Sequence, residues 1–141
     1  MKKKSTCLNC QIEFVYYESC SIGKYCCNQC QQDYQKKVII KDWLIGKYDG
    51  VTCKNTCARI ANSIRTYLIN ESNRCCSKCF INLDNPSTRE SGLQIHHKDG
   101  DALNNNKNNL EVLCPNCHWM TPNMGSKNKN ATRKKKKIIY M

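Results

Sequence analysis

The stretch LQIHHKDGDALNNNKNNLEVLCPNCHWMT, residues 93–121, decides the fold of this chain and contains all three of its histidines. It includes the cysteine pair Cys114–Cys117 and follows a similar pair, Cys76–Cys79, with 34 residues between the two pairs. Two CxxC pairs at such a distance are typical of one tetrahedral zinc ion held by four cysteines. Because four thiolates complete that site, the three histidines are available for another role.

The same stretch predicts a series of short elements. Residues 93–97 are rich in apolar side chains and predict a strand that ends at a turn. Asparagines crowd the following residues, so 98–109 is expected to be a loop, and 110–113 predicts a second strand. Pro115 suits the first turn of a helix that carries residues 116–121. One zinc ion clamping both ends would bring the histidines of the first strand against the histidine of the helix.

This pattern resembles the HNH endonucleases, in the subgroup with a four-cysteine zinc. The resemblance rests on three histidines and one asparagine framed by the four cysteines: His96, His97, Asn109, His118, Cys76, Cys79, Cys114 and Cys117. It covers about residues 57–133. It implies a small, zinc-stabilised α+β protein with a ββα-metal, treble-clef-like nuclease domain.

The resemblance also implies a role for each matched residue. His96 and His118 would ligate a catalytic divalent ion, Mg²⁺ or another metal, and His97 would be the general base that activates water. Asn109 would fix the loop and the orientation of the base. We therefore expect a metal-dependent endonuclease that hydrolyses phosphodiester bonds in DNA. The compact form with a basic tail resembles the stand-alone HNH proteins of phages and mobile elements, which implies a homing-type or packaging-associated nuclease.

Each of these features also has a plainer interpretation. His96 and His97 could be ordinary exposed histidines on a strand, and His118 could replace a cysteine as a zinc ligand. Asp99 and Asp101 are interpreted as turn caps and not as metal ligands, because short acidic side chains commonly bond their own backbone in turns. Two other functions stay open: a non-catalytic zinc-finger DNA-binding protein, and a nuclease that uses the same site on RNA.

The N-terminal third carries a second cysteine pattern. Cys7 and Cys10 form one pair, and 15 residues separate Cys10 from Cys26. Ligand pairs at that separation predict a short zinc finger. A plain CxxC reading pairs Cys27 with Cys30, whereas the resemblance to treble-clef-like fingers pairs Cys26 with Cys30, which we favour. The residues after this knuckle, 31–40, predict a helix.

The middle of the chain predicts a further helix from Lys54 to Asn70, with Ile60, Ile64 and Leu68 on one face. Four cysteines have no assigned partner and are expected to be free thiols: Cys20, Cys53, Cys57 and Cys75. We divide the chain into a four-cysteine zinc finger with its helix (1–40), a helical connector (41–72), the HNH nuclease domain (73–126) and a basic tail (127–141).

The composition agrees with a small metal-stabilised protein. Hydrophobic residues make up 40% of the 141 residues, but 13 of them are cysteines, so the apolar set is thin for one large core. Two zinc sites are therefore expected to replace part of the burial. Cysteine pairs without a signal peptide favour metal over disulfides. We expect a soluble protein inside the host cell, in its cytoplasm, without a membrane partner.

The net charge of +12 favours a polyanionic partner, and we expect double-stranded DNA. The charge is concentrated near the ends, above all in one run that is expected to contact phosphates: Arg133, Lys134, Lys135, Lys136 and Lys137. The alternative for this run is a solvated tail. The pattern does not determine the oligomeric state.

Overall fold

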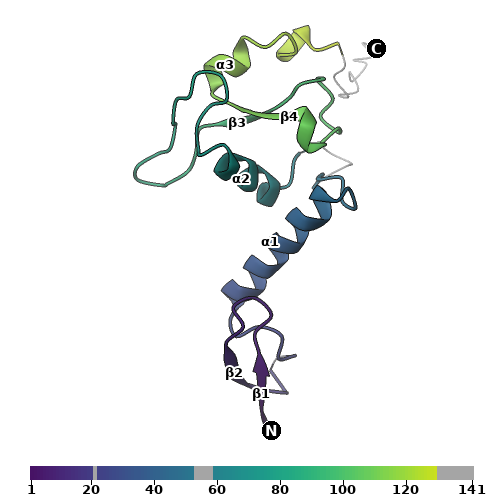
Figure 1. The fold of residues 1–141 in the computed structure, drawn as a ribbon, viewed down its shortest axis with the longest axis vertical. Coiled ribbons are helices and arrows are strands. Elements are labelled where there is room, and N and C mark those ends of the chain that lie inside the picture. Colours follow the sequence, from purple (N-terminus) through teal and green to yellow (C-terminus); the bar gives the residue numbers. More distant parts are fainter. Residues whose placement is uncertain (21, 53–58, 130–141) are drawn as a thin grey trace, which may run out of the picture. The chain divides into compact units, whose positions relative to one another are not determined.

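The computed structural model describes residues 1–20, 22–52 and 59–129 (Figure 1). The chain divides into two compact units, Met1–Ile45 and Gly46–Met141. Among the described residues, no helix is both long enough and apolar enough to cross a membrane.

The first unit begins with a hairpin that the sequence analysis did not predict. Strand β1 (Lys2–Thr6) pairs antiparallel with strand β2 (Glu13–Tyr17), and the ammonium of Lys2 lies 5.6 Å from the ring centroid of Tyr17. The side chains of β2 alternate between exposed and half-buried, as expected of a strand with one covered face. The lysine run at the start of the chain is therefore part of a strand as well as a source of charge.

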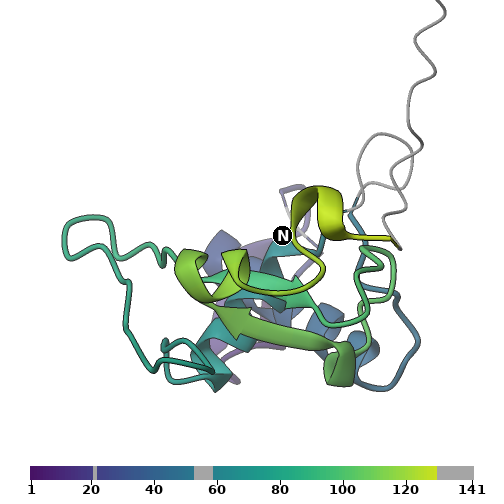
Figure 2. The ribbon, with the colours of Figure 1, turned by 90° about the horizontal axis from the view of Figure 1, so that it is seen from above.

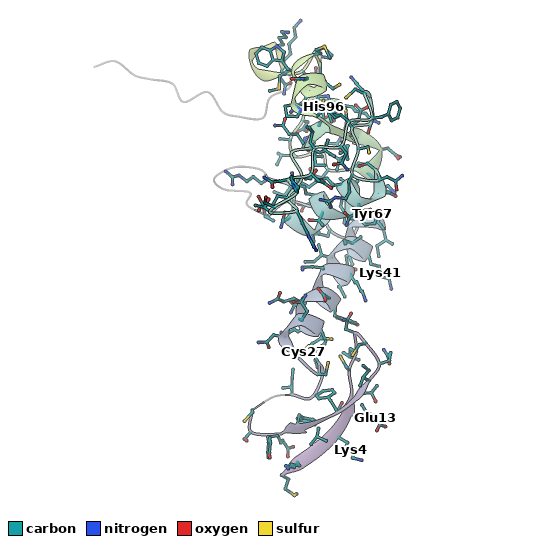
Figure 3. All side chains as sticks on the ribbon, turned by 90° about the vertical axis from the view of Figure 1, so that its left-hand side faces the viewer. Lys4, Glu13, Cys27, Lys41, Tyr67 and His96 are labelled. Atoms are coloured by element: carbon teal, nitrogen blue, oxygen red, sulfur yellow. The ribbon has the colours of Figure 1, made fainter. Side chains whose placement is uncertain are left out.

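Helix α1 (Asn28–Leu44) follows the hairpin and is longer than the predicted helix over 31–40. Its N-cap is Cys27, whose Sγ accepts a hydrogen bond from the backbone N–H of Cys30 at 3.5 Å (Figure 3). Capping by this side chain starts the helix within the cysteine knuckle, which is why it begins three residues earlier than expected. Trp43 is the buried residue of its last turn.

The second unit contains the predicted helix of the middle segment, but in a shorter form. Helix α2 (Asn62–Glu71) buries Ile64, Leu68 and Ile69. The predicted start at residue 54 lies outside the described residues, and residues 59–61 are not helical. Val51 forms a bridge with Ile60, and the N–H of Ala61 donates to Gly50 O at 2.8 Å. These extended contacts interrupt any helix between residues 59 and 61, so the predicted continuous helix up to residue 70 was wrong.

Strands β3 (Gln94–His97) and β4 (Leu110–Leu113) form an antiparallel pair, with the 3₁₀ turn η1 (Lys107–Asn109) just before β4. Helix α3 (Pro115–Trp119) follows β4 and contacts both strands, and a second 3₁₀ turn, η2 (Gly125–Lys127), follows α3 (Figure 2). Pro115 occupies the first turn of α3, as predicted. The order of elements in this part of the chain is therefore strand, loop, strand, helix.

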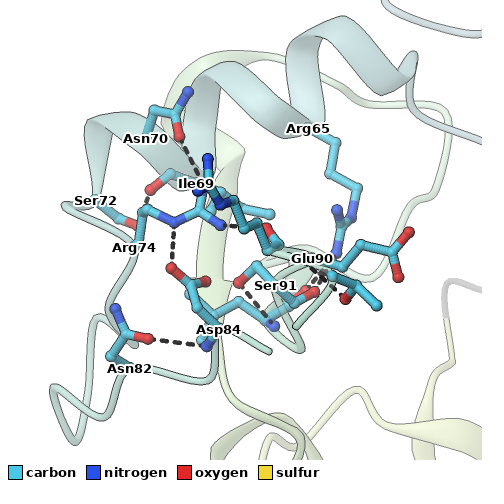
Figure 4. Close-up of polar contacts among 12 residues, drawn as sticks. Arg65, Ile69, Asn70, Ser72, Arg74, Asn82, Asp84, Glu90 and Ser91 are labelled. Atoms are coloured by element: carbon cyan, nitrogen blue, oxygen red, sulfur yellow. Dashed lines mark hydrogen bonds and ion pairs between the residues drawn. The ribbon is translucent and has the colours of Figure 1, made fainter. Parts of the chain in front are cut away.

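Two arginines connect α2 to the segment that leads into β3 (Figure 4). The Nη2 of Arg65 donates to the carbonyls of Ser91 at 3.2 Å and Leu93 at 2.8 Å. Arg74 forms an ion pair with Asp84 and donates to the carbonyl of Arg89 at 3.0 Å. A hollow of about 350 Å³ lies beside these arginines, and none of the three histidines lines it. Its residues therefore hold the β3 segment in place without forming part of the histidine site.

Candidate active site and metal centres

Four cysteines of the second unit gather in one group: Cys76, Cys79, Cys114 and Cys117. Their sulfur atoms all lie within 4.8 Å of one another. Each pair sits on a tight knuckle: the N–H of Phe80 donates to Cys76 O at 2.9 Å, and the N–H of Cys117 donates to Cys114 Sγ at 3.4 Å. Four thiols at this spacing could hold one zinc ion.

The electrostatics of this group also fit a cation. Burial alone would raise the pKa of the Cys76 thiol, but backbone N–H groups of Cys79, Cys114 and Lys78 outweigh burial and lower the pKa to about 6. Burial and the neighbouring thiols raise the pKa of Cys117 to about 12. The Cys76 thiol thus favours the charged thiolate form. The Cys117 thiol resists ionisation beside it unless a positive charge compensates. A divalent cation supplies that charge.

The first unit has an equivalent group, formed by Cys7, Cys10, Cys26 and Cys30, again with all sulfur atoms within 4.8 Å of one another. Backbone N–H groups lower the pKa of the Cys7 thiol to about 6 against the opposing effect of burial. The structure places Cys26 in the group, whereas Cys27 caps α1. Of the two alternatives for the partner of Cys30, the geometry therefore favours Cys26.

Two of the three histidines come together between β3 and α3. The rings of His96 and His118 meet edge-on with their centroids 5.1 Å apart. His96, labelled in Figure 3, is 7% exposed. Burial lowers the pKa of both imidazoles, and the proximity of His118 lowers that of His96 further. The neutral form, which is the form that ligates a metal, is therefore favoured at both positions.

Gln94 orients one member of this pair, a contact that the sequence analysis missed. Gln94 Oε1 lies 2.5 Å from His118 Nδ1, so a proton on Nδ1 leaves the lone pair on Nε2 for a metal. Gln94 stands two residues before His96 on β3, and alternate residues of a strand share a face. That two-residue spacing is the signal in the sequence that points to Gln94.

His97 is the last residue of β3 and differs from its neighbour in its contacts. Its Nε2 lies 2.8 Å from Oδ1 of Asn105, which is buried. A charge on His97 also lowers the pKa of His96 and of His118, as a smaller cause than burial. Adjacent residues of a regular strand point to opposite faces, and His97 stands at the end of β3, where that alternation no longer holds its side chain away from the pair.

Asn109 ties the two ends of the loop between β3 and β4 together. Its Nδ2 donates to Asp99 Oδ1 and to the carbonyl of Asn104, both at 2.8 Å. The N–H of Lys98 donates to the carbonyl of Asn109 at 2.9 Å. In the described part of the chain, the Asn109 side chain bonds to these loop groups and not to the His97 ring.

Asp99 and Asp101 serve the turn, as the sequence predicted. Asp99 Oδ1 accepts from the N–H of Asp101 at 2.9 Å, and Asp101 Oδ1 accepts from the N–H of Leu103 at 2.9 Å. Gly100 between them has φ +77°, and a Cβ there would collide with Asn128 Oδ1. The turn after β3 therefore requires glycine at this position.

Two sets of predicted residues lie outside the part of the chain that the structure describes. The basic run from Arg133 to Lys137, and the thiols of Cys53 and Cys57, lie outside the described residues. Cys20 and Cys75 form no disulfide with any cysteine of the described ranges. Neither belongs to the two four-cysteine groups of the described residues.

Comparison with known proteins gives two partial matches. A segment of 55 residues is 44% identical to the H-N-H endonuclease F-TflIV of Escherichia phage T5, covering 38% of this chain and 22% of the phage protein. A segment of 52 residues is 38% identical to the Zorya protein ZorE of Escherichia coli, covering 37% of this chain and 13% of that protein. The chain thus matches only a small part of each relative's length. No protein-family profile matches the chain, and no solved structure matches it.

Over the matched segment the chain is therefore similar to a phage H-N-H endonuclease, and its two four-cysteine groups fit the subgroup that bears zinc. Its architecture is a small α+β fold with two groups of thiols that could each hold a zinc ion.

Proposed function

We propose that this protein is a metal-dependent endonuclease that hydrolyses phosphodiester bonds in DNA. The observation that carries the proposal is the contact between the His96 and His118 rings, with His97 next to His96 at the end of β3. A pair of neutral imidazoles beside a third histidine offers metal ligands and a base in one place. The name of the phage relative, an H-N-H endonuclease, supports the same chemistry.

In this proposal each histidine has one task. His96 and His118 hold a divalent ion, which when bound stabilises negative charge on the scissile phosphate and the leaving oxygen. His97 accepts a proton from the attacking water, an effect worth about 10²–10⁴ in rate. Gln94 holds the ring of His118 through the contact to Nδ1. Two nitrogen ligands are compatible with Mg²⁺, Mn²⁺, Zn²⁺ or Ni²⁺.

Asn109 has a supporting task in the same proposal. Its bonds to Asp99 and Asn104 hold the loop of residues 98–109 closed at the end of β3. Because His97 is the last residue of that strand, a fixed loop limits the movement of the base. Asn109 thus acts on the orientation of His97 through the backbone.

We further propose that both cysteine groups hold structural zinc and that the arrangement is of the ββα-metal type. The order β3, β4, α3, with the histidine pair between strand and helix, supports this arrangement. The division into finger (1–40), connector (41–72), nuclease domain (73–126) and basic tail (127–141) belongs to the same proposal.

The partner in this proposal is double-stranded DNA. The net charge of +12 and the lysine-rich run at 133–137 support binding to phosphates. A homing-type or packaging-associated role in the cytoplasm of a host cell agrees with the phage relative. The proposed cleavage rests on the geometry of the site, and the proposed biological role rests on the phage relative.

The test is cleavage of supercoiled plasmid by the purified full chain, with Mg²⁺ or Mn²⁺ and with a chelator of divalent ions. We expect nicked or linear DNA only when the divalent ion is present. An equal concentration of structured and single-stranded RNA is offered in parallel reactions. Binding without cleavage would favour the non-catalytic zinc-finger alternative, and cleavage of RNA alone would favour the RNA nuclease.

A further inference from the structure

We infer that Asn105 is a positioning residue that fixes the neutral tautomer of His97, so that Nδ1 is the atom that takes the proton from water. The inference rests on the proposed function for its catalytic meaning. It goes further because it assigns an atom to the base and a task to a residue outside the matched pattern of histidines and Asn109.

The contacts of the Asn105 side chain carry the inference. Its Oδ1 lies 2.8 Å from His97 Nε2, and its Nδ2 donates to the backbone carbonyl of Asp49 at 3.1 Å. Asn105 is 3% exposed, although it lies in a loop crowded with asparagines. This buried amide is held in one orientation, since turning it over would place Oδ1 against the carbonyl oxygen of Asp49, where two acceptors face each other.

The two contacts together determine where the proton of His97 lies. A backbone carbonyl can only accept a hydrogen bond, so the amide NH₂ of Asn105 must face Asp49 O. The amide oxygen must then face His97, and an oxygen acceptor requires a proton on Nε2. In a neutral imidazole with its proton on Nε2, the lone pair is on Nδ1. Nδ1 is therefore the basic atom.

The hydrogen-bond acceptor of the Asn105 amide nitrogen, Asp49 O, lies near the beginning of the second unit. Asp49 precedes Asn105 by 56 residues, and its carboxylate accepts from the N–H of Val51 at 3.1 Å. The neighbouring carbonyl of Gly50 accepts from the N–H of Ala61 at 2.8 Å. The turn that presents Asp49 O is thus fixed by the chain that leads into α2. A segment far from the histidines in sequence determines the tautomer of the base.

Removing the amide should affect the base more than the fold. In Asn105→Leu the side chain keeps about its size, but Nε2 loses its acceptor and either tautomer of His97 becomes accessible. Asn105→Asp keeps an oxygen for the Nε2 proton, loses the donor to Asp49 O and adds a negative charge beside the ring, which favours the doubly protonated imidazole. Asn108→Leu, at an exposed position of the same loop, is the matched control.

The direct test is ¹⁵N NMR of the imidazoles in the zinc-loaded full chain, at about pH 8, where an ordinary histidine is neutral. The signals of His97 are assigned by their loss in His97→Gln. We expect a protonated Nε2 and an unprotonated Nδ1 in the wild type and in Asn108→Leu, a larger fraction of ring protonated at both nitrogens in Asn105→Asp, and a mixture of tautomers in Asn105→Leu. A wild-type His97 with its proton on Nδ1 would overturn the inference, whatever the variants do.

The kinetic test uses plasmid cleavage at saturating DNA and divalent ion. Loss of the orienting partner should lower the kcat of Asn105→Leu about 10- to 100-fold with little change in KM. Asn105→Asp should recover rate only above the raised pKa of the ring, where Nδ1 is free to accept a proton, and Asn108→Leu should match the wild type. An Asn105→Leu variant with an unchanged tautomer and unchanged kcat would refute the positioning role. If the wild type has the expected tautomer and cuts no DNA, the proposed function fails while the tautomer assignment stands.

Discussion

Replacing Cys114 by serine should unfold the second unit and leave the first intact. Cys114 is 4% exposed, belongs to the sulfur group with Cys76, and its Sγ caps the helix that carries His118. A structural zinc contributes about 10–16 kcal/mol of apparent binding free energy. A small domain has a total stability of about 5–15 kcal/mol. Losing one ligand therefore removes a contribution as large as the whole stability of the unit.

The assay combines zinc analysis with hydrogen exchange. The wild type should contain two zinc ions per chain, one for each cysteine group, and Cys114→Ser should contain one. Backbone amides of β3 and β4 should lose protection in this variant, while those of β1 and β2 keep it. Cys7→Ser should show the reverse pattern. The matched controls are Cys75→Ser and Cys20→Ser, whose sulfur atoms lie outside both groups.

The same assay separates the two candidates in the N-terminal knuckle. Cys26→Ser should lose the first zinc, whereas Cys27→Ser should keep it, because a serine hydroxyl can replace the helix cap. Two zinc ions in Cys114→Ser with protected β3 and β4 amides would refute the structural role of the second group. Loss of both zinc ions from either single variant would refute the independence of the two sites.

Three further changes test other parts of the molecule. Gln94→Leu frees His118 Nδ1 and should weaken binding of the catalytic ion about 10- to 100-fold, measured as the Mn²⁺ dependence of cleavage, with zinc content unchanged. Arg74→Met leaves Asp84 without its ion pair and should lower the denaturation midpoint of the second unit; an unchanged midpoint would contradict a stabilising role. Truncation after Ala131 should weaken DNA binding equally for all sequences and reduce the slope of log affinity against log salt by about 0.9 for each phosphate that the tail neutralises. An unchanged slope would show that the tail binds no phosphate.

Local patterns predicted a strand and a cysteine group next to the candidate site. The predicted strand at 110–113 is confirmed by β4. The strand was predictable because asparagines precede its apolar run and the knuckle that contains Pro115 follows it. The spacing of the second cysteine set predicted a group that the structure brings within ligand distance. Both signals are short-range, and both depend on residue types with few structural alternatives.

Prediction from sequence failed where a residue type is compatible with several structures or roles. The lysines at the start of the chain indicated charge, and their pairing with β2 was not predicted because a hairpin depends on a partner strand. The helix over 54–70 was predicted from apolar periodicity. Periodicity contains no information on the bridge between Ile60 and Val51, which interrupts a helix there. Among five asparagines in the 98–109 loop, no local signal distinguishes Asn105, since its two partners come from β3 and from Asp49.

The most direct test of the central claim is the single-turnover rate of His97→Ala at saturating DNA and divalent ion. The variant should retain two zinc ions and wild-type DNA affinity, because the ring of His97 lies outside both cysteine groups. Its cleavage rate should fall at least about 10²-fold, the usual contribution of a general base. A variant that still cuts at more than about a tenth of the wild-type rate would contradict the assignment of His97 as the base.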